Sequence, residues 1–182
     1  MLKLADNPTQ LLPGLQRPAE AAGEWWVAHT KPRMEKALAW DLTARGVAYY
    51  LPLARRTVMS GGRRRTMMIP LFPSYVFFCG LSDTRLSVLT TKRVCHILPV
   101  PQRQTFVSEL ESVHAALGVN GDLNVYPHAV VGKRCRVARG PMRGIEGTVI
   151  QDQDVTRLVL SVSIIGSGTF LEINAADLED AD

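Results

Sequence analysis

The chain has 182 residues, of which 46% are hydrophobic and 21% charged, and its net charge is +4. These values are ordinary for a globular protein with one full core or two small ones. No apolar run approaches the roughly 20 residues that span a bilayer, and the first residues lack the apolar segment of a secretory signal. We therefore expect a cytoplasmic protein that does not bind membranes.

Charge divides the chain into two halves. Residues 24–118 carry 13 Lys/Arg against 6 Asp/Glu, a balance of +7, whereas residues 119–182 carry 6 against 9, a balance of −3. The first 23 residues carry two of each sign. This asymmetry predicts two domains with different partners, of which the basic one lies near nucleic acid.

No constellation of residues predicts catalysis or metal binding. Cys79, Cys95 and Cys135 are widely spaced and form no Cys-x-x-Cys pair, which indicates reduced, structural cysteines. Cys95 adjoins His96, but the sequence supplies no third group to orient them, and neighbours on a strand face opposite ways. We expect a protein that is not an enzyme and holds no cofactor or metal.

In chain order, residues 1–23 contain three prolines and no periodicity, and are predicted to be a flexible extension. A first domain is expected over residues 24–118, with the order β-α-β-β-α-β and a final helix, which is the ferredoxin-like pattern. Strands are predicted at 24–30, 47–53, 75–79 and 94–98, helices at 33–45, after residue 84 and at 105–117, and a hairpin at 55–65 that turns at residues 60–62.

The pattern of hydrophobic residues changes in the second half of the chain. Residues 119–129 lack periodicity and are predicted to be a linker. Residues 130–182 contain four or five short alternating stretches separated by turns, which predicts a small β-barrel. The stretch 157–165 alternates β-branched and small polar residues, which favours a strand in a permanent barrel over a helix.

The stretch at residues 69–78 has two prolines around a Leu-Phe pair, followed by a run of β-branched and aromatic residues. Because proline fixes φ and extends the preceding residue, Leu71 and Phe72 are predicted to lie in a rigid, irregular segment before a strand. Such an apolar pair is either part of the core or a docking surface. For docking, Phe72 must face outward.

Five arginines surround the predicted hairpin turn, namely Arg55, Arg56, Arg63, Arg64 and Arg65. The ordinary interpretation is a solvated face of the hairpin. Since like charges across a hairpin repel one another, a phosphate-bearing partner is the alternative.

Two parts of the sequence carry recognisable motifs. Residues 131–149 contain a basic strand, a Gly-Pro turn, a second glycine and Gly147, and are similar to a KOW motif. Residues 162–166 and 171–173 match the end of such a domain. Upstream, Trp-Trp-Val at 25–27, Leu-Phe-Pro-Ser-Tyr-Val at 71–76 and Val-Cys-His-Ile at 94–97 resemble the NusG N-terminal domain. Together the two parts resemble the NusG family of transcription elongation and antitermination factors.

The resemblance implies an α+β protein, with a ferredoxin/RRM-like antiparallel sheet and helices followed by an SH3-like β-barrel. It also implies a non-catalytic monomer whose N-terminal domain docks on the clamp helices of RNA polymerase, bridges the DNA cleft towards the gate loop and suppresses pausing or termination. The KOW domain would recruit Rho or ribosomal protein S10.

Site residues follow from the same resemblance. Lys31 and Lys92, with Arg93 beside it, match basic positions that approach the exposed non-template DNA strand in the RfaH-like branch of the family. Arg63, Arg64 and Arg65 are further candidates for nucleic-acid binding, from the charge of the hairpin rather than from the resemblance. The remaining positions that match are Trp26, His29, Leu71, Phe72, Pro73 and Tyr75 for polymerase docking, Thr84 and Arg85 for the gate loop, and Ile164 and Ile165 for the KOW partner.

The chain also departs from the family pattern. Thr84 and Arg85 lie where RfaH-like proteins have His-Thr-Thr, Ile165 stands in place of a phenylalanine, Ser167 in place of an arginine, and Ser74 in place of the usual glycine. Three of the departures favour a specialised paralogue: the N-terminal extension, the missing aromatic at Ile165 and the serine at position 74. A ribosome-associated RNA-binding protein, gripping RNA with its KOW barrel and arginine hairpin, is the alternative function.

Overall fold

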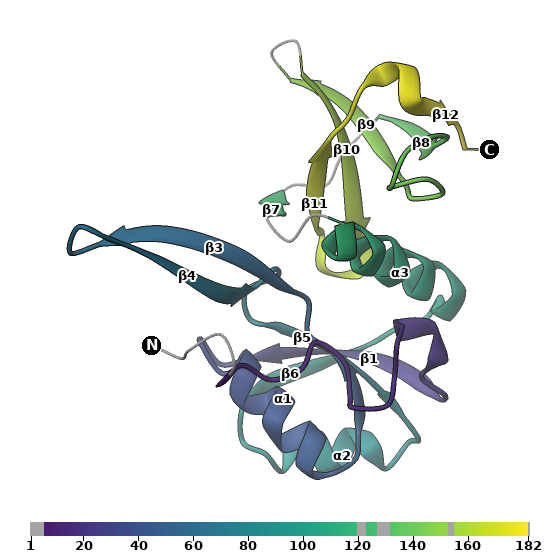
Figure 1. The fold of residues 1–182 in the computed structure, drawn as a ribbon. Helices are drawn as coiled ribbons and strands as arrows, with labels where there is room; N and C mark the ends of the chain where they lie inside the picture. The colour runs from purple at the N-terminus through teal and green to yellow at the C-terminus, as the bar shows by residue number, and fades with distance from the viewer. Residues whose placement is uncertain (1–5, 120–122, 127–131, 153–154, 182) are drawn as a thin grey trace. The chain divides into compact units, whose positions relative to one another are not determined.

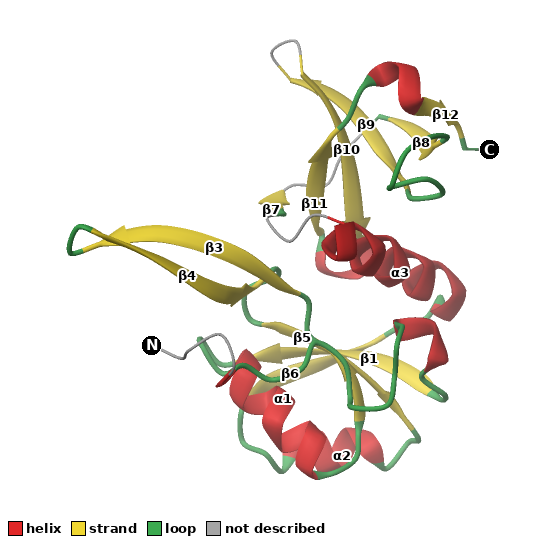
Figure 2. Cartoon of the chain, in the orientation of Figure 1, coloured by secondary structure: helices red, strands yellow, loops and turns green. Residues whose placement is uncertain are grey.

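A computed structural model describes residues 6–119, 123–126, 132–152 and 155–181 of the chain (Figure 1). The chain divides into two compact units, residues 1–104 and residues 105–182. Both units combine strands with few helices, as Figure 2 shows. Within the described residues, no helix is long and apolar enough to cross a membrane.

The first unit contains a four-stranded antiparallel sheet in the order β2-β5-β1-β6. The sequence of elements is β-α-β-β-α-β with a hairpin inserted, which confirms the predicted split βαβ pattern. The elements are β1 (Glu24–Thr30), α1 (Glu35–Ala44), β2 (Ala48–Tyr50), β5 (Tyr75–Gly80), α2 (Thr84–Leu89) and β6 (Val94–Pro99).

The core of this unit lies between the sheet and its two helices, α1 and α2, which cover one face of the sheet (Figure 1). Alternate residues of each strand point to this face. Trp26 of β1 stacks on Phe78 of β5 with ring centroids 5.3 Å apart. Leu38 and Leu42 of α1 and Val88 of α2 pack into the same cluster.

The described part of the N-terminal segment is packed, and the prediction of a flexible extension is wrong for it. Leu11 is buried and forms a β-bridge with Tyr50. The Leu51 N–H donates to the Gln10 carbonyl at 2.7 Å. A short 3-10 helix, η2 (Pro18–Glu20), lies between this segment and β1. The physical reason is that β2 is an edge strand whose backbone groups need partners. Residues 1–5 lie outside the described residues.

The inserted hairpin is a separate two-stranded sheet, formed by β3 (Leu53–Ser60) and β4 (Arg63–Pro70). Its two-residue turn has Gly61 at φ 58° and Gly62 at φ 72°, the positive angles that a type I′ hairpin turn requires. The ribbon projects from the body of the first unit (Figure 1). The sequence predicts both this hairpin and its turn.

The second unit contains a six-stranded antiparallel sheet in the order β12-β8-β9-β10-β11-β7. Helix α3 (Arg103–Val119) belongs to this unit from residue 105 onward. The other elements are β7 (Asn124–Tyr126), β8 (Lys133–Val137), β9 (Glu146–Asp152), β10 (Val155–Val162), η3 (Ser163–Ile165), β11 (Ser167–Glu172), η4 (Ala175–Asp177) and β12 (Leu178–Asp180).

This unit differs from the prediction in three places. The compact units divide at residue 104/105, not after residue 118. The predicted linker 119–129 contains strand β7, which pairs with β11, and residues 120–122 and 127–129 lie outside the described residues. Strand β10 ends at Val162 and a 3-10 turn replaces the last three residues of the predicted strand. Residues 130–131 and 182 also lie outside the described residues.

Candidate functional site

Three loops meet at one end of the N-terminal sheet. Because β1 is antiparallel to both of its neighbours, its last residues lie beside the first residues of β5 and β6. The Thr30 N–H donates to the Ser74 carbonyl and the Lys31 N–H to the Arg93 carbonyl, each at 2.8 Å. We call this region, residues 29–33, 71–75 and 91–93, the loop end of the sheet.

The loop end concentrates unusual backbone conformations. Arg33, Ser74 and Lys92 have φ angles of 63°, 66° and 60°, in the left-handed region that disfavours side chains by roughly 1–2 kcal/mol per residue. Within the described residues, no other residue except glycine has a positive φ. Such conformations persist only where the surrounding structure holds them in place, and they cluster at functional sites.

A β-turn at residues 72–75 presents Pro73 to solvent. The Tyr75 N–H donates to the Phe72 carbonyl at 3.2 Å; Pro73 occupies the second position and Ser74, with its positive φ, the third, which defines a type II turn. The buried Glu35, at the start of α1, accepts the Ser74 N–H at 2.6 Å. The turn is therefore held by the backbone of β1 on one side and by α1 on the other.

Leu71 and Phe72 are buried, and the expectation that Phe72 faces outward is wrong. Their exposed fractions are 1% and 2%, and the Phe72 ring packs edge-on against Phe77 with centroids 6.0 Å apart. The reason is that the turn directs its two corner residues outward and its apolar first residue inward. Trp26, 6% exposed, also belongs to the core rather than to the surface.

Aromatic rings still reach the surface of the loop end. His29 and Tyr75 are half-buried, with ring centroids 5.1 Å apart. The exposed His96 lies on the other side of His29, at 4.6 Å. Together with Pro73, these side chains form the apolar part of the site that a partner can touch.

Basic side chains lie in the same loops as this apolar part. Lys31, Arg33 and Lys92 are exposed, and no ion pair to another described residue is found for them. Arg33 was not among the predicted site residues, although the Lys-Pro-Arg sequence after β1 signals a basic loop.

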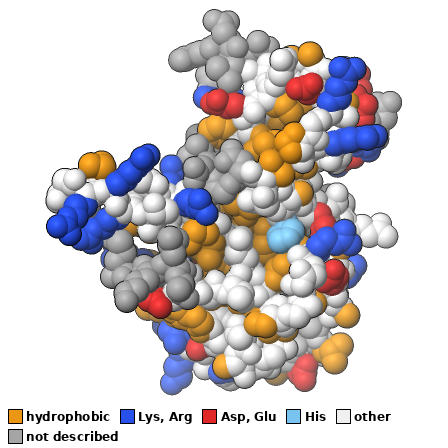
Figure 3. All heavy atoms as spheres, in the orientation of Figure 1, with side chains coloured by type: hydrophobic (Ala, Val, Ile, Leu, Met, Phe, Trp, Pro, Cys, Tyr) orange, Lys and Arg blue, Asp and Glu red, His pale blue; other side chains and the backbone are white. Residues whose placement is uncertain are grey.

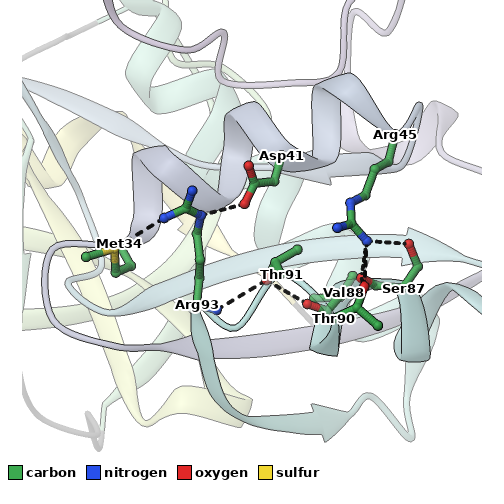
Figure 4. Close-up of polar contacts among 8 residues, drawn as sticks. All are labelled: Met34, Asp41, Arg45, Ser87, Val88, Thr90, Thr91 and Arg93. Atoms are coloured by element: carbon green, nitrogen blue, oxygen red, sulfur yellow. Dashed lines mark hydrogen bonds and ion pairs between the residues drawn. The ribbon is translucent and has the colours of Figure 1, made fainter.

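Arg93, which was also predicted to contact nucleic acid, has a structural role in the fold. Its guanidinium forms an ion pair with Asp41 of α1 at 2.5 Å and contacts the Met34 sulfur at 3.6 Å (Figure 4). Its side chain is 34% exposed. Arg45 makes a similar connection, donating to the Thr90 hydroxyl at 2.8 Å. The two arginines tie α1 to the segment that carries Lys92.

The three arginines Arg63, Arg64 and Arg65 are exposed and lie at the far end of the hairpin from the loop end. Lys and Arg side chains gather over this projecting ribbon in Figure 3. The expected repulsion directly across the hairpin is absent, since the register pairs Arg64 with Met59 and Arg65 with Val58.

Thr84 and Arg85 start α2, just after the last residue of β5. They therefore lie at the end of the sheet opposite to the loop end. Thr84 accepts the Leu81 N–H with its hydroxyl at 3.0 Å, and Arg85 is exposed. The structure does not bring these residues together with the other candidates.

In the second unit, Ile164 and Ile165 lie half-buried in η3. The preceding Ser163 donates its N–H to Glu109 of α3 at 3.2 Å, and its hydroxyl bonds the same carboxylate. Burial raises the pKa of Glu109 above its usual value, and the hydrogen bonds from Ser163 oppose this shift. The turn that carries both isoleucines is thus attached to α3.

A second carboxylate of this unit shows the opposite shift. Glu146 of β9 accepts from Arg136 at 2.9 Å and from Arg134 at 3.2 Å. The hydrogen bond from Arg136 is the main reason that the pKa of Glu146 is lowered.

Within the described residues, no group of three or more His, Cys, Asp or Glu side chains is placed to hold a metal ion.

The comparisons with known proteins agree with the resemblance in the N-terminal half. The family model described as "Transcription termination factor nusG" matches residues 23–115. This match covers half of the chain, and it spans the four-stranded sheet, the hairpin and most of α3. A comparison with curated proteins finds no match. The chain therefore belongs to the NusG family of transcription factors.

Proposed function

We propose that the chain regulates transcription elongation by binding RNA polymerase through the loop end of its N-terminal sheet, where it reduces pausing or termination without catalysing a reaction. The observation that carries the proposal is the turn at residues 72–75. It presents Pro73 in a backbone fixed by Glu35, beside the half-buried rings of His29 and Tyr75. Rigid apolar and aromatic groups are frequent anchors of protein interfaces.

The cations beside this turn suit a nucleic acid held next to the polymerase. Lys31, Arg33 and Lys92 offer exposed charges with no ion-pair partner among the described residues. Basic side chains attract a single strand through its backbone and need no sequence readout. We assign them to the exposed non-template DNA strand.

The opposite end of the sheet gives the unit a second possible contact. Arg85 lies about one strand length from the loop end, and a six-residue strand spans roughly 20 Å. A domain that docks on the clamp helices by the loop end could reach the gate loop with Arg85. The absence of the His-Thr-Thr sequence means that Arg85 would make this contact by charge.

The second unit would recruit a further partner, Rho or ribosomal protein S10, through the turn at Ile164 and Ile165. We propose that its six-stranded sheet curls into the SH3-like barrel of a KOW domain. We also propose that the protein acts as a monomer in the cytoplasm.

Binding to purified elongation complexes tests the proposed function. Tyr75→Ala and the double change Lys31→Gln with Lys92→Gln should each weaken binding about tenfold or more, because interface anchors commonly contribute about 2 kcal/mol or more. Arg17→Gln is the control for loss of an exposed charge elsewhere, since Arg17 lies in the N-terminal segment before β1 and outside the loop end. Co-purification of ribosomal RNA in place of polymerase subunits, or unchanged binding by both site variants, would contradict the proposal.

A further inference from the structure

We propose that the β3–β4 hairpin is a second nucleic-acid site, separate from the loop end, and that it inserts into a groove of double-helical B-form DNA. The proposal goes beyond the proposed function, which uses the loop end and a single strand. It depends on the charge, the faces and the composition of this ribbon.

The hairpin carries charge of one sign. Residues 53–70 contain five arginines and no acidic residue. All five arginines are exposed, and none forms an ion pair with another described residue. The apolar Val58 and Met59 near the tip are also exposed, Met59 by 70%. Five guanidinium groups on one ribbon, without an ion pair among the described residues, favour a phosphate-bearing ligand, because arginine binds phosphate in bidentate geometry.

Arginines occupy both faces of the ribbon. Side chains alternate along a strand, and directly paired residues share a face. The register Arg56↔Met67 and Val58↔Arg65 therefore places Arg56 and Arg65, with Arg63, on one face. Arg55 and Arg64 lie on the other. A ribbon with cations on both faces can meet two rows of phosphates at once, as it would between the two strands of a duplex.

The residue composition of the hairpin indicates which kind of nucleic acid it binds. Residues 53–70 contain no aromatic residue, whereas binding of single strands relies on aromatic side chains that stack on bases. The major groove of an RNA duplex is deep and narrow and does not admit a ribbon. The major groove of B-form DNA, about 12 Å wide, admits a two-stranded β-ribbon. The observations therefore favour duplex DNA.

The base of the hairpin is anchored, so that the arm can hold its direction. Lys36 of α1 donates to the Met68 carbonyl at 2.5 Å, and the Leu71 N–H donates to the Pro52 carbonyl at 2.8 Å. Leu53 and Ala54 are buried. A free two-stranded hairpin is marginally stable in water, and these contacts supply the support that it lacks.

Fluorescence anisotropy with the full chain tests the proposal, using a DNA duplex of about 20 base pairs, one of its strands alone and an RNA duplex of the same sequence and length. Equal lengths matter because the number of phosphates sets the part of the affinity that does not depend on sequence. The triple change Arg63→Gln, Arg64→Gln, Arg65→Gln is compared with Lys31→Gln, Arg33→Gln, Lys92→Gln, which removes the same charge from the loop end. Duplex DNA should bind tightest, and the hairpin triple alone should lose most of that affinity.

The salt dependence gives a quantitative expectation. Five phosphate contacts predict that affinity falls about 500-fold between 50 and 200 mM salt, and two remaining contacts about 12-fold. Equal losses in both triples would mean that net charge, not the hairpin, binds DNA, and would overturn the proposal. A preference for the single strand or for the RNA duplex would overturn it as well.

Two double variants test insertion into a groove. Arg56→Gln with Arg65→Gln changes one face of the ribbon, and Arg55→Gln with Arg64→Gln changes the other. Both should weaken duplex binding by similar factors, and an effect confined to one face would rule out insertion. The hairpin triple should retain binding to elongation complexes that are assembled without flanking duplex, so failure of this proposal is distinguishable from failure of the proposed function.

Discussion

Ser74 holds the third position of the turn before β5 with a φ of 66°, an angle that glycine adopts without strain. Its N–H is bonded to Glu35 and its carbonyl to Thr30, so the surroundings keep the serine in this conformation. No hydrogen bond from the Ser74 hydroxyl to another described residue is found. A single substitution at this position can therefore remove the free-energy cost of the left-handed conformation.

Ser74→Gly should raise the free energy of unfolding by about 0.5–1 kcal/mol, because relief of the left-handed strain, roughly 1–2 kcal/mol, exceeds the added chain entropy of glycine. Urea unfolding followed by circular dichroism measures the change. Ser108→Gly is the matched control: Ser108 is exposed in the middle of α3, and glycine there should lower stability by about 0.5–1 kcal/mol. Destabilisation by Ser74→Gly would contradict the turn assignment.

The exposure of charged side chains was easier to predict than the orientation of apolar ones. Lys31 and Lys92, which were named from the family resemblance, are exposed, as charged side chains usually are. Phe72 and Trp26 were assigned to the surface although they are buried. The runs at residues 25–28 and 76–79 are buried on both faces of the sheet, and a continuous apolar run carries no alternation that distinguishes the faces.

At the scale of elements, the sequence predicted those elements whose conformation depends on residues close to one another in the chain. Strand β1, the glycine turn of the hairpin and helix α1 follow from β-branched runs, paired glycines and helical spacing. Strands β7 and β12 have three residues each and exist through pairing with β11 and β8. The contact of Glu35 with Ser74 spans 39 residues. No local pattern contains such information.

Contact between α3 and η3 should respond to pH. A carboxyl group whose pKa is raised in the folded state binds its proton more tightly there than in the unfolded chain. The ionised Glu109 therefore lowers the free energy of unfolding at neutral pH. This loss disappears as the pH falls through the raised pKa towards the ordinary value of 4.5. Relative to Glu109→Gln, the natural chain should therefore gain stability between pH 7 and pH 5. Thermal unfolding of both chains at the two pH values measures the difference.

Glu146→Gln provides the control of opposite sign. The pKa of Glu146 is lowered by Arg136, so its stabilising effect is complete above the ordinary value near 4.5 and is lost as pH falls through the lowered pKa. Relative to Glu146→Gln, the natural chain should lose stability below pH 4.5, and nothing should change between pH 7 and pH 5. A common direction for both variants would show that the two carboxylates do not act as the structure indicates.

For the whole molecule, charge is more strongly divided between the compact units than the sequence-based boundary indicates. Residues 1–104 carry 15 Lys/Arg against 6 Asp/Glu, a balance of +9, and residues 105–182 carry 6 against 11, a balance of −5. Glu109 and Glu111 of α3 make the difference, because the helix begins at the boundary. The acidic unit should therefore weaken the attraction of the basic unit for DNA.

A chain ending at residue 119 tests this effect, since it loses residues 120–182 and their balance of −3 but keeps α3 whole. It should bind duplex DNA about two- to fivefold more tightly than the full chain at about 20 mM salt, and the two should agree at about 200 mM salt, where the screening length falls below about 10 Å. The full chain with Glu172→Gln, Asp177→Asn and Glu179→Gln loses the same negative charge without loss of the unit, and should reproduce the gain. If the shorter chain, shown to be folded by circular dichroism, bound more weakly at low salt, the second unit would itself contact DNA, and the two units would share one ligand.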